Sequence, residues 1–165
     1  MIVELEWYEM DVAINVGINR NTASWRKERK HSAGYKPKDL FDTGIKSAAA
    51  EMAVAKKLEL YWDGSVDTFK SKADVGNRTE VRMSSMRVPK LIVRPNDKPD
   101  RDYVLVVDLW EHGKKPKFDL VGWMLGREAM SEQYLTDNGN GRPPAYFVPV
   151  TDLRSMEDRD YDANY

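Results

Sequence analysis

Three acidic residues in the first half of the chain have the types and spacing of a metal site. Glu51 lies in an alanine-rich stretch, and Asp74 and Glu80 flank a tight turn in the segment KADVGNRTEVR. Carboxylates that converge on one point repel each other unless a cation joins them, and Mg²⁺ is the usual cation among oxygen ligands. Arg82 follows Glu80 by two residues and would add a positive charge on the same face of a strand. The pattern therefore predicts a metal-dependent phosphodiesterase.

A helix over about 44–60 must position Glu51. Asp42 or Thr43 can cap this helix, and Asp63-Gly64 marks the turn after it. On a helical wheel the lysines lie opposite Glu51, whereas small or apolar residues surround it. These neighbours are Gly44, Ser47, Ala48, Val54, Ala55 and Leu58. Glu51 is thus the one charge in the middle of the apolar face, although an exposed helical glutamate is the simpler alternative.

A hairpin is predicted to position the other two acids. Its strands are residues 73–75 and 79–83, joined by a loop of Gly76, Asn77 and Arg78. Asp74 and Glu80 lie side by side if the register puts them on one face. The alternatives are that Asp74 is an ordinary turn residue and that Glu80 and Arg82 form a solvated strand face.

The rest of the chain predicts a single domain of the α/β (α+β) class with a central mixed sheet flanked by helices. An extra N-terminal helix is expected over about 6–29, the core over about 42–150, and a flexible acidic tail over about 152–165. A third helix is expected over 127–135. The expected strands cover residues 66–69, 91–93, 103–110, 118–125 and 146–150. The strands over 103–110 and 118–125 are expected to pair with each other.

Composition narrows the possible chemistry. The chain of 165 residues has no cysteine, which excludes disulfides, thiolate zinc sites and thiol nucleophiles. A charged fraction of 32% with a net charge of −1 predicts a soluble protein that binds nucleic acid only through local basic patches. No apolar run is long enough for a membrane span, no secretory signal opens the chain, and no phosphate-binding loop suggests a nucleotide cofactor.

The acidic motif resembles that of the PD-(D/E)XK nuclease superfamily, which has the restriction-endonuclease-like fold. Over about residues 5–153 the chain is similar to a group of phage-encoded proteins of that type. The segments that carry this similarity are AEMAVAK (50–56), YWDGSVDTF (61–69), DVG (74–76), EVR (80–82), LIVRP (91–95), VGW (121–123) and GRPPAYFVP (141–149).

The resemblance implies a set of functional residues. Glu51, Asp74, Glu80 and the carbonyl of Val81 would bind Mg²⁺ or Mn²⁺, and the motif's lysine would position or activate water. Here Arg82 replaces that lysine, and arginine keeps its proton up to about pH 12 or higher. Arg82 would therefore hold the scissile phosphate or orient a hydroxide rather than act as a base. Ala73 stands where the motif has proline.

DNA is the expected partner of such a domain. The basic residues Arg87, Lys90 and Arg94 follow the EVR segment and suit contacts with the phosphate backbone. The resemblance predicts a phage-type DNA nuclease in the cytoplasm of an infected host cell. The rival hypotheses are a weak or inactive nuclease fold that binds DNA or a host protein, and an assembly protein of a virus particle. Endonuclease or exonuclease action, DNA or RNA, and monomer or homodimer stay open.

Overall fold

Strand β4 (Asp102–Asp108) runs through the centre of the molecule and is buried on both faces. The computed structural model describes residues 1–28, 40–68, 71–84, 86–111, 113–137 and 142–159. Tyr103 and Leu105 pack into one apolar cluster, and Val104 and Val106 pack into another on the opposite face. A strand covered on both faces has a nearly continuous apolar sequence, which is why the sequence predicts this strand correctly.

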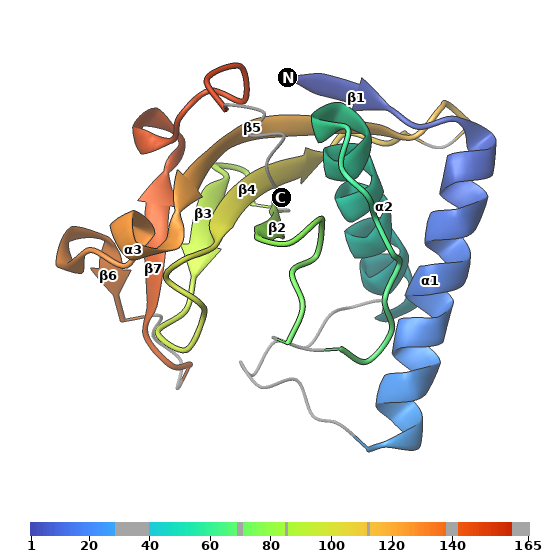
Figure 1. Ribbon diagram of the computed structural model, residues 1–165, viewed down its shortest axis with the longest axis horizontal. Coiled ribbons are helices and arrows are strands. Elements are labelled where there is room, and N and C mark those ends of the chain that lie inside the picture. The colour runs from blue at the N-terminus through green and yellow to red at the C-terminus, as the bar shows by residue number, and fades with distance from the viewer. Residues whose placement is uncertain (29–39, 69–70, 85, 112, 138–141, 160–165) are drawn as a thin grey trace.

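A mixed sheet of four strands surrounds β4 (Figure 1). Its strand order is β1 (Ile2–Glu4), β5 (Lys117–Leu125), β4 and β2 (Thr79–Ser84). Strands β2 and β4 are parallel, whereas the other pairs are antiparallel. The expected pairing of the strands near 103–110 and 118–125 is confirmed, and the pair is antiparallel. The α+β class with a mixed central sheet is confirmed as well.

A second, antiparallel sheet has three strands in the order β3 (Lys90–Val93), β7 (Ala145–Pro149) and β6 (Leu135–Thr136). Leu91 and Val93 are fully buried, while Lys90 and Ile92 face the other side of β3. This alternation follows from the period of two residues in a strand. Strand β3 is an edge of this sheet as β2 is an edge of the first.

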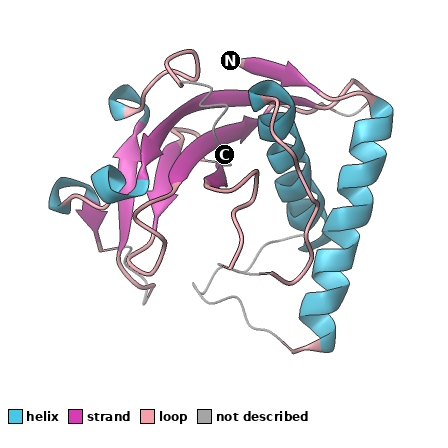
Figure 2. Ribbon diagram, viewed as in Figure 1, coloured by secondary structure: helices cyan, strands magenta, loops and turns pink. Residues whose placement is uncertain are grey.

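Two long helices, α1 (Trp7–Arg26) and α2 (Leu40–Leu58), cover one face of the four-stranded sheet (Figures 1 and 2). The second sheet contributes Leu91, Val93 and Val148 to the core on the other face, so the two long helices flank only one side. Helix α2 begins before the predicted caps Asp42 and Thr43. Its alanines let it pack closely between α1 and the sheet. Among the described residues, no helix is long and apolar enough to cross a membrane.

The predicted helix over 127–135 is wrong. The chain instead forms one helical turn, α3 (Gly126–Ala129), then a short 3₁₀ helix, η1 (Glu132–Tyr134), and strand β6. Leu135 pairs with Tyr146 of β7, so the backbone hydrogen bonds of this segment go to the second sheet. Tertiary pairing has overridden a weak helical preference. The predicted strand over 66–69 is also absent at its described residues 66–68.

The C-terminal segment also differs from the expected flexible tail over 152–165. After the 3₁₀ helix η2 (Val150–Asp152), the backbones of Trp123 and Arg154 exchange two hydrogen bonds of 3.0 Å. Met156 is buried, and Arg159 donates hydrogen bonds to Thr79 Oγ1 at 2.7 Å and to Asp102 Oδ2 at 3.1 Å. The segment up to residue 159 therefore packs against the starts of β2 and β4, and residues 160–165 lie outside the described ones.

Candidate active site

Strand β2 places Glu80 and Arg82 on one face and Val81 and Met83 on the other. Val81 and Met83 pack toward the core cluster that contains the helices. The predicted hairpin is reduced to a single bridge between Val75 and Thr79, and the partner of β2 over its whole length is β4. The turn still holds the segment before β2 beside its start.

Three of the predicted ligand atoms converge on one nitrogen of Arg82. The Nη1 atom of Arg82 lies 3.3 Å from Glu80 Oε2, 3.7 Å from Asp74 Oδ2 and 3.2 Å from the carbonyl oxygen of Val81. Asp74 is fixed in this place because its Oδ2 accepts a hydrogen bond of 2.8 Å from the Val81 backbone N–H. The structure thus brings Asp74, Glu80 and Val81 together around a cationic group.

The other nitrogen of Arg82 is held by a residue that the sequence did not single out. Nη2 lies 3.2 Å from Asp97 Oδ2, which also accepts a hydrogen bond of 2.9 Å from the Arg94 backbone N–H. The guanidinium group stacks over the ring of Tyr103, with 5.1 Å from Cζ to the ring centroid. Arg82 is therefore fixed from both ends and from one face.

Glu51 is buried, as its place on the apolar face of the helix predicts, but it has its own cation. Arg20 of α1 binds it with two hydrogen bonds of 2.6 and 2.8 Å, and Trp62 Nε1 donates a third of 3.0 Å. Arg20 falls on the same stripe of α1 as the buried residues Met10, Ala13 and Gly17. Because a charged residue on a buried stripe needs a partner of opposite charge, the position of Arg20 could have predicted its pairing with a buried acid.

Glu80 is also anchored from outside the predicted set. Arg101 forms an ion pair with Glu80 Oε1, and its Nη1 donates a hydrogen bond of 2.8 Å to the carbonyl oxygen of Lys72. Arg101 is buried just before β4. An arginine that immediately precedes an apolar strand gave no sequence signal of this role.

The acids interact electrostatically through Asp74. Burial, followed by the charge of Glu51, raises the pKa of the Asp74 carboxyl to about 6, against the lowering effects of Arg82, the Val81 N–H and Arg20. A raised pKa means that the ionised carboxylate lacks full compensation from its present neighbours.

Glu80 shows the same effect. Burial raises the pKa of the Glu80 carboxyl, and the charge of Asp74 adds to the increase, while Arg82 and Arg101 lower it. Clustered acids with raised pKa values are a feature of functional sites, although structural ion-pair networks produce them too.

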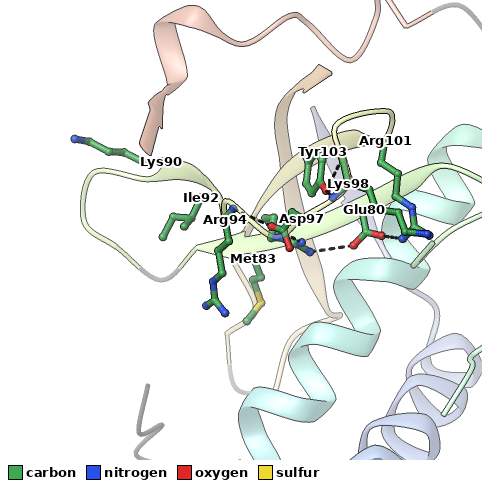
Figure 3. Close-up of a pocket in the computed structure, with 10 residues that line it drawn as sticks. Glu80, Met83, Lys90, Ile92, Arg94, Asp97, Lys98, Arg101 and Tyr103 are labelled. Atoms are coloured by element: carbon green, nitrogen blue, oxygen red, sulfur yellow. Dashed lines mark hydrogen bonds and ion pairs between the residues drawn. The ribbon is translucent and has the colours of Figure 1, made fainter. Parts of the chain in front are cut away.

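A pocket of about 410 Å³ opens beside this cluster, between the edge strands β2 and β3 (Figure 3). Two of the three predicted DNA-binding residues, Lys90 and Arg94, line it. Arg87 is not among its lining residues and lies exposed on the connection between the two strands. Lys98, Arg101 and Asp97 also line the pocket and were missed by the sequence analysis.

The described residues contain no group of three or more acidic or histidine side chains close enough to form a ready-made metal site. Glu51 contacts Arg20 and Trp62 rather than Glu80. The oxygens of Asp74, Glu80 and Val81 do share one neighbour, but it is Arg82. In this arrangement arginine groups compensate the acids.

Comparison with protein-family models, with curated proteins and with solved structures finds no match. The site alone must carry the function. The site consists of oxygen atoms gathered around the guanidinium group of Arg82, next to a pocket lined by further basic residues.

The raised pKa of Asp74 predicts a measurable pH dependence of stability. Between about pH 4 and pH 6 the folded state binds more protons than the unfolded state, so this group makes wild-type stability fall as pH rises. Relative to wild type, the free energy of unfolding of Asp74→Asn should therefore rise by about 1–3 kcal/mol from pH 4 to pH 7. Urea unfolding at both pH values measures this change.

Asp63→Asn is the matched control for this experiment. Burial acts to raise the pKa of Asp63, but hydrogen bonds from Lys72 and Ser65 lower it overall. Its stabilising effect is therefore complete above about pH 4, and Asp63→Asn should show no rise. An Asp74→Asn variant that behaved like this control would contradict the crowding of acids around Asp74.

Proposed function

We propose that this chain is a Mg²⁺-dependent nuclease of the restriction-endonuclease-like fold, which hydrolyses phosphodiester bonds in DNA. The observation that carries the proposal is the convergence of oxygen atoms from Asp74, Glu80 and Val81 on the cationic nitrogen of Arg82. These are the ligands that the motif predicts, and they lie at the mouth of a pocket lined by basic residues.

The donor set fits a hard divalent cation in its chemistry. All three donors are oxygens, and both carboxyl groups have raised pKa values that a nearby cation would lower. Bound Mg²⁺ or Mn²⁺ would supply activated water and neutralise charge on the phosphoryl group.

Each residue of the chain then has a separate task. Asp74 and Glu80 hold the cation, with Arg101 keeping Glu80 in place from the side away from it. Arg82 cannot serve as a base because it keeps its proton, but its guanidinium group can bind a phosphate oxygen. Glu51 adds negative charge beside Asp74 while Arg20 keeps it fixed.

A second candidate function is a nuclease fold that binds DNA without cutting it. The observation that favours it is again Arg82, because an internal guanidinium group already satisfies the oxygens that a metal ion would need. In that case the basic pocket would still bind phosphates. For both candidate functions, the phage origin and the action inside an infected host cell are predictions from the sequence resemblance alone.

Nicking of supercoiled plasmid in Mg²⁺ or Mn²⁺, with EDTA as the blank, tests the proposal. Wild type and Glu80→Gln are purified in parallel, because glutamine still offers Arg101 an oxygen acceptor and so preserves the fold. We expect metal-dependent nicking that Glu80→Gln loses and that the exposed control Glu128→Gln keeps. Equal nicking by wild type and Glu80→Gln would contradict the assigned site, and no nicking by wild type with intact DNA binding would favour the binding protein.

A further inference from the structure

The pocket between β2 and β3 carries more positive charge than its own acids neutralise. Its two carboxylates, Glu80 and Asp97, are paired with Arg101 and Arg82. The side chains of Lys90, Arg94 and Lys98 make no ion pair with any residue that the structure describes. These three cations can therefore pair with an anionic ligand.

The cations are presented by two different backbone elements. Lys90 and Ile92 lie on the same side of β3, and Arg94 follows directly after the last residue of this strand. Lys98 comes from the connection before β4, where Tyr103 accepts a hydrogen bond from the Lys98 N–H and donates one to the Lys98 carbonyl, both 3.0 Å. The connection that carries Lys98 is therefore fixed to the core.

One wall of the pocket is apolar. Met83 and Ile92 line it, and both are partly exposed. Figure 3 shows Lys90 at the far end from Glu80 and Arg101, with Arg94 and Ile92 between them. The volume of about 410 Å³ falls within the roughly 300–1,000 Å³ of small-ligand sites. An anionic ligand with an apolar, flat part would match both the charge and the wall.

We propose that this pocket binds one nucleotide of the substrate strand, with its phosphate on Arg94 and Lys98 and its base against Met83 and Ile92. The inference rests on the proposed function and extends it, because Glu80 and Arg82 belong both to the pocket and to the acid cluster. A nucleotide held there puts the neighbouring phosphodiester bond next to Asp74 and Glu80. The pocket thus selects which bond reaches the acids.

Binding measured in EDTA tests the pocket without any cleavage. The probe is a single-stranded 16-nucleotide DNA with a fluorescein label at its 3′ end, followed by fluorescence anisotropy. The double variant Arg94→Gln/Lys98→Gln should weaken binding at least about tenfold and reduce the salt slope by about two. Both side chains are exposed, so both substitutions should leave the fold intact, which a thermal melt verifies.

The control Lys114→Gln/Lys115→Gln removes the same charge beyond the opposite end of β4, and it should change the affinity less than about twofold. Equal losses in the two double variants would reduce the effect to general electrostatics and overturn the pocket. Unchanged binding by Arg94→Gln/Lys98→Gln would overturn it as well. Neither result touches the nuclease proposal, because no metal is present in this assay.

Three forms of the probe identify the source of the nucleotide. The circular form carries its fluorescein on an internal base, because it has no 3′ end. A 5′-phosphorylated strand that binds more tightly than a 5′-hydroxyl strand and a circular strand would place a strand end in the pocket. Equal binding of all three forms, each weakened by Arg94→Gln/Lys98→Gln, would place an internal nucleotide there. Both results support a nucleotide site, whereas three forms that each bind equally well to wild type and to Arg94→Gln/Lys98→Gln would contradict it.

Discussion

Replacing Arg82 with glutamine is expected to change two properties in opposite directions. The rate of DNA nicking should fall by about 100- to 1,000-fold, because a preorganised cation near the phosphate is lost. Binding of Mn²⁺ should become at least about tenfold tighter, because a like charge near 4 Å costs a few kcal/mol at an effective dielectric constant of about 20. Isothermal titration calorimetry gives the metal affinity, and plasmid nicking gives the rate.

The structural reason is that Arg82 stands where the metal's charge would act. Its Nη1 atom contacts the oxygens of Asp74, Glu80 and Val81. Arg82→Lys should restore part of the nicking, since lysine keeps the charge but loses the contact that its second nitrogen makes with Asp97. Arg87→Gln, on the exposed connection, should leave metal affinity unchanged. Weaker metal binding by Arg82→Gln would refute competition between arginine and metal.

Replacing Arg20 with methionine is expected to cost about 3–5 kcal/mol of folding free energy, because a buried carboxylate would lose its compensating charge. The Glu51 side chain is 8% exposed and accepts two hydrogen bonds from Arg20. Of the described hydrogen-bond donors to Glu51, only the neutral Nε1–H of Trp62 would remain. Urea unfolding at pH 7 measures the loss, with Arg26→Met at the exposed end of α1 as the control.

The double variant Arg20→Met/Glu51→Leu separates charge from packing. Removing both ions leaves two apolar side chains of similar size, and such exchanges are often neutral for stability. We therefore expect the double variant to recover most of the stability that Arg20→Met loses. A double variant as unstable as the single one would mean that Arg20 acts mainly through its packing between α1 and the 59–68 segment, where its Nε also donates to the Ser65 carbonyl.

The elements predicted well were those whose pattern reflects burial. Strand β4 is apolar on both faces, and α2 surrounds one charge with small residues, so each pattern corresponds to one environment. The hairpin at 73–83 was overpredicted because β2 has a partner far along the chain, in β4. Local pattern cannot reveal such a partner, and the same limit explains why the segment over 127–135 was read as a helix.

The candidate site shows a similar division. The acids were predicted from a motif, and Asp74, Glu80 and the Val81 carbonyl do gather at one point. The cations that compensate them include Arg20 from α1 and Arg101 from the residues before β4. Neither Arg101 nor Asp97, which pairs with Arg82, stands in a local sequence pattern that predicts its role. Only the fold brings cations from remote segments to acids whose spacing is local.

The contact of Arg159 with the starts of β2 and β4 has a consequence for the order of assembly. The hydrogen bond between Arg159 and Thr79 joins residues that are 80 positions apart, and Glu80 is the next residue in the chain. A ribosome therefore makes every acid of the cluster long before it makes the residue that fastens their strand. Since distant contacts form late, a nascent chain would carry the acids before Arg159 can fasten the start of β2.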